Sequence, residues 1–159
     1  MIKKIKYITI FLFLLNGCGF KNINSIYENN LIIKNINITG QQSIIYLFKN
    51  ELYDLKNNQN TSNGVELDLN VDFKKNIYEK NNKNVTTKYS LNVTAYLTLK
   101  NDLDKTLKRK NFSKADNYNV GSNTTITISN EKKLLENLTK SLVRDIKNFL
   151  QQQSKQLDN

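Results

Sequence analysis

Two stretches in which apolar and polar residues alternate strictly constrain the fold of this chain more than any other feature. In VELDLNVDF (65–73) every second residue is apolar, and TTKYSLNVTAYLTL (86–99) repeats the pattern from Tyr89 to Leu99. A period of two predicts β-strands with one buried and one solvated face. Because only the polar residues 74–84 separate the two runs, we expect an antiparallel hairpin with a charged connection.

Apolar residues at three- and four-residue steps predict two helices. The first covers QQSIIYLFKNELYDLKNN (41–58), and the second covers EKKLLENLTKSLVRDIKNFLQQQ (131–153). The start of the second helix stays open, because NTTITIS (123–129) either forms its first turns or, by its composition, a strand. Residues 31–40 read as a β-branched strand, and residues 105–119 read as a polar edge strand whose lysines discourage edge-to-edge pairing.

The resulting element order is β-α-β-β-β-α. It predicts an α/β (α+β) two-layer sandwich, in which one mixed four-stranded sheet is covered on one face by two helices. The first helix can cross between two parallel strands in the right-handed sense. The uncovered face is expected to stay polar, and it carries Asp68, Asn70, Ser90, Asn92 and Thr94.

The first residues have the organisation of an export signal. Three lysines precede the apolar run 8–15, which is shorter than the roughly 20 residues that a membrane-spanning helix needs. Leu15-Asn16-Gly17-Cys18 resembles a bacterial lipobox, in which the cysteine is acylated and becomes the first residue of the mature chain. We therefore expect a cleaved signal peptide at 1–17, a lipidated tether at 18–30, one domain at 31–150 and a frayed tail at 151–159.

Composition argues against an enzyme. The chain has no histidine, and its one cysteine, Cys18, is assigned to the lipid, so histidine triads, thiol nucleophiles and zinc sites are excluded. No metal and no cofactor is expected beyond the diacylglycerol and N-acyl lipid on Cys18. A carboxylate-dependent hydrolase acting on the envelope is the enzymatic alternative, since Glu66, Asp68 and Asp72 lie along one strand face.

A formal charge of +10, or +7 without residues 1–17, predicts an anionic partner such as a phosphate-bearing lipid. Nucleic acid is not expected, because an exported chain would not meet it. The candidate anion-binding residues are Lys108, Arg109, Lys110, Lys74, Lys75, Lys80 and Lys83. The alternative is that these side chains are only solvated surface charges.

The ordered set of motifs resembles the LPS-assembly lipoprotein family LptE, particularly its alphaproteobacterial branch. Cys18-Gly19-Phe20 with Tyr27 matches the lipidation site, and residues 31–55 match the family's strand, turn and helix. KYSLNVTAYLTL (88–99) resembles the family's middle strand. Tyr118-Asn119-Val120, followed by a helix with Arg144-Asp145-Ile146 and Leu150, resembles its C-terminal third.

This resemblance implies a non-enzymatic lipoprotein, anchored in the outer membrane on the periplasmic side because Gly19 rather than Asp follows Cys18. It implies that the protein assists assembly of the β-barrel LptD, plugs it and supports lipopolysaccharide transport. The expected partners are LptD, lipopolysaccharide and the lipid of the outer membrane. The alternative function is an accessory lipoprotein of an envelope ABC-type lipid transporter, or a generic periplasm-facing scaffold.

Overall fold

The computed structural model describes residues 31–56, 64–101 and 105–157. Cys18, the predicted signal peptide and the predicted tether lie outside these residues. The elements, in chain order, are β1 (Ile33–Gly40), α2 (Gln42–Leu52), the short 3-10 helix η3 (Tyr53–Leu55), β2 (Val65–Lys80), β3 (Thr86–Lys100), β4 (Thr106–Asn119) and α3 (Thr124–Leu157). The predicted order of strands and helices is confirmed.

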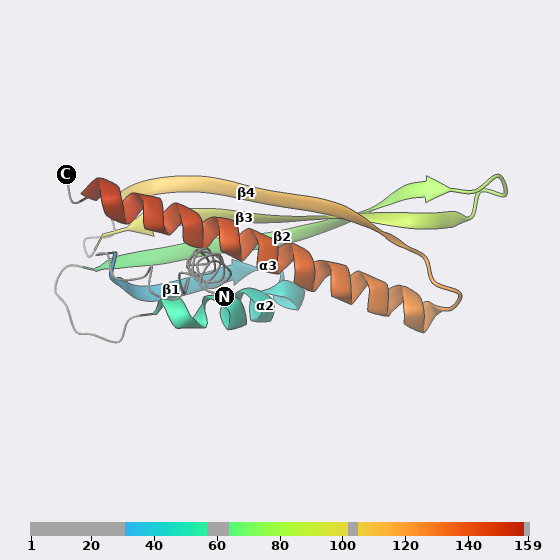
Figure 1. Ribbon diagram of the computed structural model, residues 1–159, viewed down its shortest axis with the longest axis horizontal. Coiled ribbons are helices and arrows are strands. Elements are labelled where there is room, and N and C mark those ends of the chain that lie inside the picture. The colour runs from blue at the N-terminus through green and yellow to red at the C-terminus, as the bar shows by residue number, and fades with distance from the viewer. Residues whose placement is uncertain (1–30, 57–63, 102–104, 158–159) are drawn as a thin grey trace, which may run out of the picture.

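The four strands form one mixed sheet in the order β1-β2-β3-β4. β1 pairs parallel to β2, and the other two pairs are antiparallel. Figure 1 shows α2 and α3 on the same face of this sheet, with α3 crossing it along its length. The predicted two-layer sandwich, including the edge position of β4, is therefore correct.

The alternating residues of β2 and β3 build the core, as their period predicts. Leu69 and Val71 on β2 and Val93 on β3 are at most 1% exposed, because they face the two helices. The helices supply the other half of this core from their apolar stripes, through residues such as Ile44, Phe48, Leu142 and Ile146. The opposite sheet face carries polar pairs, of which Asn37 with Asp68 is one.

Gly40 ends β1 in a way that only glycine allows. Its φ is +115°, and a Cβ added there would overlap the backbone carbonyl of Val71 on the neighbouring strand. Gln41 follows, and its N–H donates to the Val71 carbonyl oxygen at 2.9 Å. The turn at Gly40 therefore places α2 against β1 and β2.

The charged connection predicted at 74–84 is mostly strand. β2 runs to Lys80 and β3 begins at Thr86, so only residues 81–85 connect the two strands. Alternation is hard to see there because almost every side chain is exposed, yet β3 offers a hydrogen-bonding partner along nearly the whole length. The hairpin is consequently much longer than the sequence pattern indicated.

α3 is also longer than predicted, with 34 residues. Its start is now settled, because Asn123 caps it: the Ile126 N–H donates to Asn123 Oδ1 at 2.9 Å. At the other end the helix continues to Leu157, and Ser154 is only 5% exposed. Most of the tail predicted to fray is thus helical. Neither helix among the described residues is long and apolar enough to span a membrane.

Candidate functional site

The hairpin of β2 and β3 extends past the end of β1 and forms a projecting arm, which we call the distal arm (residues 72–94). β1 ends in register with Val71, whereas β2 continues to Lys80. In Figure 1 the tip of this arm reaches beyond both helices. Four of the seven predicted anion-binding residues lie on it: Lys74, Lys75, Lys80 and Lys83.

Strand register separates two neighbouring lysines of the arm. Lys74 pairs with Asn92 and therefore points to the uncovered face, whereas Lys75 pairs with Leu91 and points to the helix side. Both lysines are exposed, but Lys75 also contacts α3. Two lysines that are adjacent in the sequence thus lie on opposite faces of the sheet.

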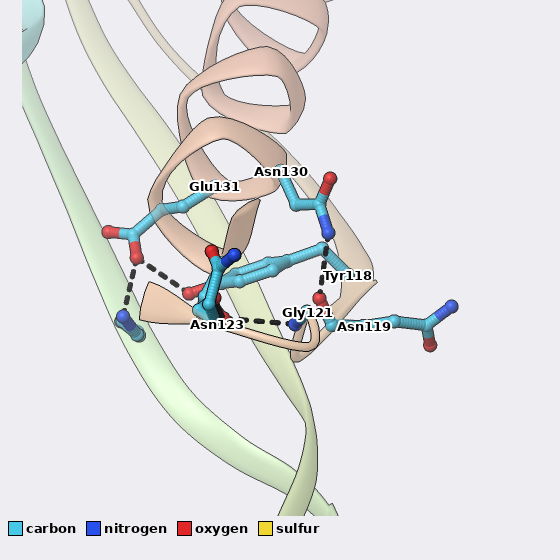
Figure 2. A network of polar contacts seen from close by, with 8 residues as sticks. Tyr118, Asn119, Gly121, Asn123, Asn130 and Glu131 are labelled. Atoms are coloured by element: carbon cyan, nitrogen blue, oxygen red, sulfur yellow. Dashed lines mark hydrogen bonds and ion pairs between the residues drawn. The ribbon is translucent and has the colours of Figure 1, made fainter. Parts of the chain in front are cut away.

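Lys75 is the cation of a network that links three elements. Its Nζ lies 2.5 Å from Oε2 of Glu131 on α3, and the hydroxyl of Tyr118 on β4 donates to the same oxygen at 2.6 Å. Figure 2 shows Glu131 reaching from the helix to the hydroxyl of Tyr118. The ammonium also lies 4.4 Å from the ring centroid of Tyr89, which stacks on Tyr118 with 5.7 Å between centroids.

The pKa shifts of this network favour the ion pair. Partial burial raises the pKa of Glu131, but the hydrogen bonds from Lys75 and Tyr118 outweigh it, so the pKa lies below its usual value. For Lys75, burial lowers the pKa, but the hydrogen bonds to Glu131 and Tyr118 and the charge of Glu131 together outweigh it, so the net shift is upward. Burial and the Glu131 carboxylate raise the pKa of Tyr118 to about 12. Tyr118 is therefore a neutral donor between two charged groups.

The corner between β4 and α3 holds Glu131 in position. The Gly121 N–H donates to Thr127 Oγ1 at 2.9 Å, and Asn130 Nδ2 donates to the Asn119 carbonyl oxygen at 3.0 Å. Figure 2 shows these bonds closing the first turns of α3 onto the end of β4. The arm is thereby braced against the helix at its base.

The tip of the arm is preformed by its own turn. Asn81 Oδ1 accepts hydrogen bonds from the N–H groups of Lys83 and Val85, at 2.9 and 3.0 Å. Lys80 Nζ donates to Asn84 Oδ1, and Asn84 takes the left-handed conformation (φ 60°) that asparagine tolerates. The turn needs no partner to take this shape.

Around this turn, large apolar side chains stand in solvent beside lysines. Ile77, Tyr78 and Val85 are each more than half exposed. Lys80 and Lys83 are exposed next to them, and Lys88 is engaged by Glu79 at 2.6 Å. A surface that combines cations with exposed apolar groups suits a ligand that is itself amphiphilic and anionic.

The other predicted basic cluster lies at the opposite end of the sheet. Lys108 and Lys110 pair with Leu99 and Leu97 and lie on the helix side, whereas Arg109 lies on the uncovered face. Lys110 Nζ sits 4.6 Å from the ring centroid of Phe149 and is partly committed to that contact. Along β3, the partners of Lys75 and Lys110 are six residues apart, or about 20 Å, and those of Lys80 and Lys108 are thirteen residues apart, or about 43 Å, so the two clusters do not form one site.

No protein-family model and no curated protein matches the sequence. Rare lipoprotein B from Shewanella oneidensis has a similar solved structure, with a TM-score of 0.59 and 11% sequence identity over 79% of this chain and 99% of that one. Lipoprotein B from Nitrosomonas europaea has a TM-score of 0.56 and 13% identity over 80% of this chain and 86% of that one. A minor lipoprotein from Acinetobacter baumannii has a TM-score of 0.52 and 14% identity over 78% of this chain and 95% of that one. The chain has the fold of these lipoproteins.

The carboxylates considered for hydrolysis are placed on the uncovered face. Asp68 is held by Lys100 at 2.9 Å, and this hydrogen bond is the main reason why the pKa of Asp68 lies below its usual value. Among the described residues, no group of three or more acidic, histidine or cysteine side chains is arranged to hold a metal ion.

Sequence reasoning missed the network of Lys75, Tyr118 and Glu131. Strand parity carried part of the signal, because Lys75 shares its parity with Phe73 and so belongs on the helix side. The pairing with Glu131 could not be read from the sequence, because it joins residues that are 56 positions apart. The exposed Ile77 and Tyr78 were likewise hidden inside a predicted connection.

Proposed function

We propose that this chain is an outer-membrane lipoprotein of the LptE type, anchored on the periplasmic side through acylated Cys18. In this role it assists assembly of the LptD β-barrel, plugs it and supports transport of lipopolysaccharide to the outer leaflet. The proposal involves no catalytic step, because the function is binding and folding assistance.

The distal arm is the observation that carries this proposal. Its tip offers Lys80 and Lys83 beside exposed Ile77, Tyr78 and Val85. Lipid A combines phosphates with acyl chains, and this surface offers complementary groups for both. The turn is held by its own hydrogen bonds, so little ordering would be needed on binding.

Two further features support the plug role. The uncovered sheet face is mostly polar, although Tyr96 stands exposed on it, and a polar face suits the wet, polar lumen of a large barrel. The fold is also shared with solved proteins that are named lipoproteins, in agreement with the lipobox at Cys18.

The first experiment is affinity purification of the tagged chain from detergent-solubilised outer membranes. We expect a heat-modifiable barrel, identified as LptD, to co-purify with the chain in a stoichiometric amount. We also expect the chain to need Cys18 to be found in the membrane fraction. Recovery of inner-membrane transporter subunits instead would favour the accessory role in an ABC-type lipid transporter. Recovery of the chain alone would refute the plug role.

A second experiment tests the arm directly. The double variant Lys80→Glu/Lys83→Glu should weaken binding to purified lipopolysaccharide by about tenfold, because two exposed attractions become repulsions. The matched control is Lys49→Glu/Lys140→Glu, which makes the same charge change on exposed helix positions. Equal losses in both variants would show that only net charge matters and that the arm is not the site.

A further inference from the structure

The outer edge of β4 carries backbone N–H and C=O groups that point away from the sheet at every second residue. The Val120 N–H donates to the Thr87 carbonyl oxygen at 2.9 Å, so even-numbered residues of this strand direct their backbone groups toward β3. Odd-numbered residues from Arg109 to Asn119 therefore direct theirs outward, where the described part of the chain supplies no further strand.

Only one end of this edge is occupied by the chain itself. The Asn117 N–H donates to Asp116 Oδ1 at 2.7 Å, and the Asn119 carbonyl oxygen accepts from Asn130. Between Arg109 and Ala115, no hydrogen bond to the outward backbone groups is seen within the described residues. Four residues, with alternating donors and acceptors, form a regular template for a strand.

A groove of about 410 Å³ runs beside this open segment. It is lined on the β4 side by Lys110, Asn111, Phe112 and Ser113, and on the α3 side by residues that include Asn148 and Gln152. Successive side chains of a strand point to opposite sheet faces, yet four consecutive residues of β4 line this groove. The groove therefore follows the edge of the strand rather than one face of the sheet. A strand added to β4 would direct alternate side chains into it.

Charge indicates what such a strand should carry. β4 holds Lys108, Arg109, Lys110 and Lys114 against a single acid, Asp116. Lys114 is already paired with Asp145 on α3 at 2.7 Å, which leaves the run 108–110 to face an incoming strand. Like charges directly opposite destabilise a sheet and opposite charges stabilise it. These cations therefore disfavour a second copy of β4 and favour an acidic strand.

We propose that the β4 edge from Arg109 to Ala115 binds an extended acidic segment of a partner protein by strand addition, with an acidic side chain facing Lys110 in the groove. Main-chain hydrogen bonds would supply affinity, and the alternating side-chain positions would supply selectivity. The inference is independent of the lipid anchor and of lipopolysaccharide, and it would hold if the proposed function failed.

The test uses the full chain, purified in mild detergent and labelled with ¹⁵N. The probe is an acetylated seven-residue peptide, Glu-Thr-Glu-Val-Thr-Val-Thr, with a second peptide carrying Lys in place of both Glu. We expect the acidic peptide to shift the amide resonances of residues 109, 111, 113 and 115 and to slow their hydrogen exchange. Two further versions of the acidic peptide carry N-methyl groups on alternate backbone nitrogens, one version for each edge of the extended peptide. Only one of them should lose affinity, because only one edge of the peptide can pair with β4.

Variants of the chain test the same contacts. Lys108→Glu/Lys110→Glu should weaken the acidic peptide by about tenfold and restore binding of the lysine peptide, whereas Lys133→Glu, on the exposed face of α3, should do neither. Asn111→Pro should abolish binding, because it removes an outward N–H on an edge strand where proline is tolerated. Thermal unfolding of each variant confirms that it is folded.

Three results would overturn the proposal. The first is the absence of binding at millimolar peptide. The second is equal affinity for both N-methylated peptides, which would mean that backbone pairing is not involved. The third is reversible dimerisation of the chain that protects the amides of β4, measured by sedimentation and hydrogen exchange, which would assign the edge to a second copy.

Discussion

Replacing Glu131 by Gln tests whether the network of Lys75, Tyr118 and Glu131 braces the distal arm. The variant keeps an acceptor for Tyr118 but removes the charge that holds Lys75. Hydrogen bonds to charged groups contribute about 1.5–3 kcal/mol when protected from water. The two side chains are 35% and 25% exposed, so solvent screening reduces this, and we expect a loss of about 1–2 kcal/mol. The matching fall in Tm is about 3–8 °C.

The loss should depend on pH in a direction that the pKa shift fixes. The pKa of Glu131 in the folded chain lies below its ordinary value of 4.5. Its contribution is therefore complete above pH 4.5 and is lost as the pH falls through the folded pKa. The difference in unfolding free energy between wild type and Glu131→Gln should be constant from pH 7 to about 5.5 and shrink toward pH 3.

Urea unfolding, followed by circular dichroism across this pH range, measures the difference. Glu136→Gln on the same helix is the control, since no ion pair is seen for Glu136 among the described residues, and its removal should change stability by less than about 0.5 kcal/mol. Tyr118→Phe in both backgrounds completes a double-mutant cycle, and we expect a coupling of about 0.5–1.5 kcal/mol. Equal stability of wild type and Glu131→Gln at pH 7, or a deficit that does not change with pH, would refute the reasoning.

Three other substitutions have definite expectations from their surroundings. Gly40→Ala should cost at least about 2 kcal/mol, because φ is +115° and the new Cβ meets the Val71 backbone; a loss below 1 kcal/mol in urea unfolding would contradict this. Leu142→Ala, at a side chain with no exposure, should cost about 2.7–5 kcal/mol by the same assay. Lys114→Met should cost less than about 1 kcal/mol, since its pair with Asp145 is exposed; a larger calorimetric change would mean a stronger role.

Periodicity predicted the parts of the fold in which one face is buried. The alternation of 65–73 and 86–99 gave the hairpin, the buried face and the polar face, because a one-residue slip would expose every apolar side chain. The helical stripe at Leu142 and Ile146 was equally informative. Where both faces are exposed, as from Lys74 to Lys80, no pattern exists to read, and the strand was mistaken for a connection.

The candidate site was predicted in its parts but not in its arrangement. Clustering in sequence identified Lys108, Arg109 and Lys110 as one basic run, whereas the strand's alternation divides them between two faces. The contact between Lys75 and Glu131 joins residues that are 56 positions apart and depends on where α3 begins. Such a contact is set by tertiary packing, which a single sequence does not display.

The length of α3 can be compared with the thickness of a lipid bilayer. Its 34 residues rise about 50 Å, and β3 covers a similar length beneath it. A bilayer with its headgroups is about 40–45 Å thick. If the chain stands upright inside a barrel, as the proposed function requires, the sheet is long enough to reach water at both surfaces of a membrane. A load applied at the tip of the arm would then be transmitted along β3 to Lys100, at the opposite end of the sheet.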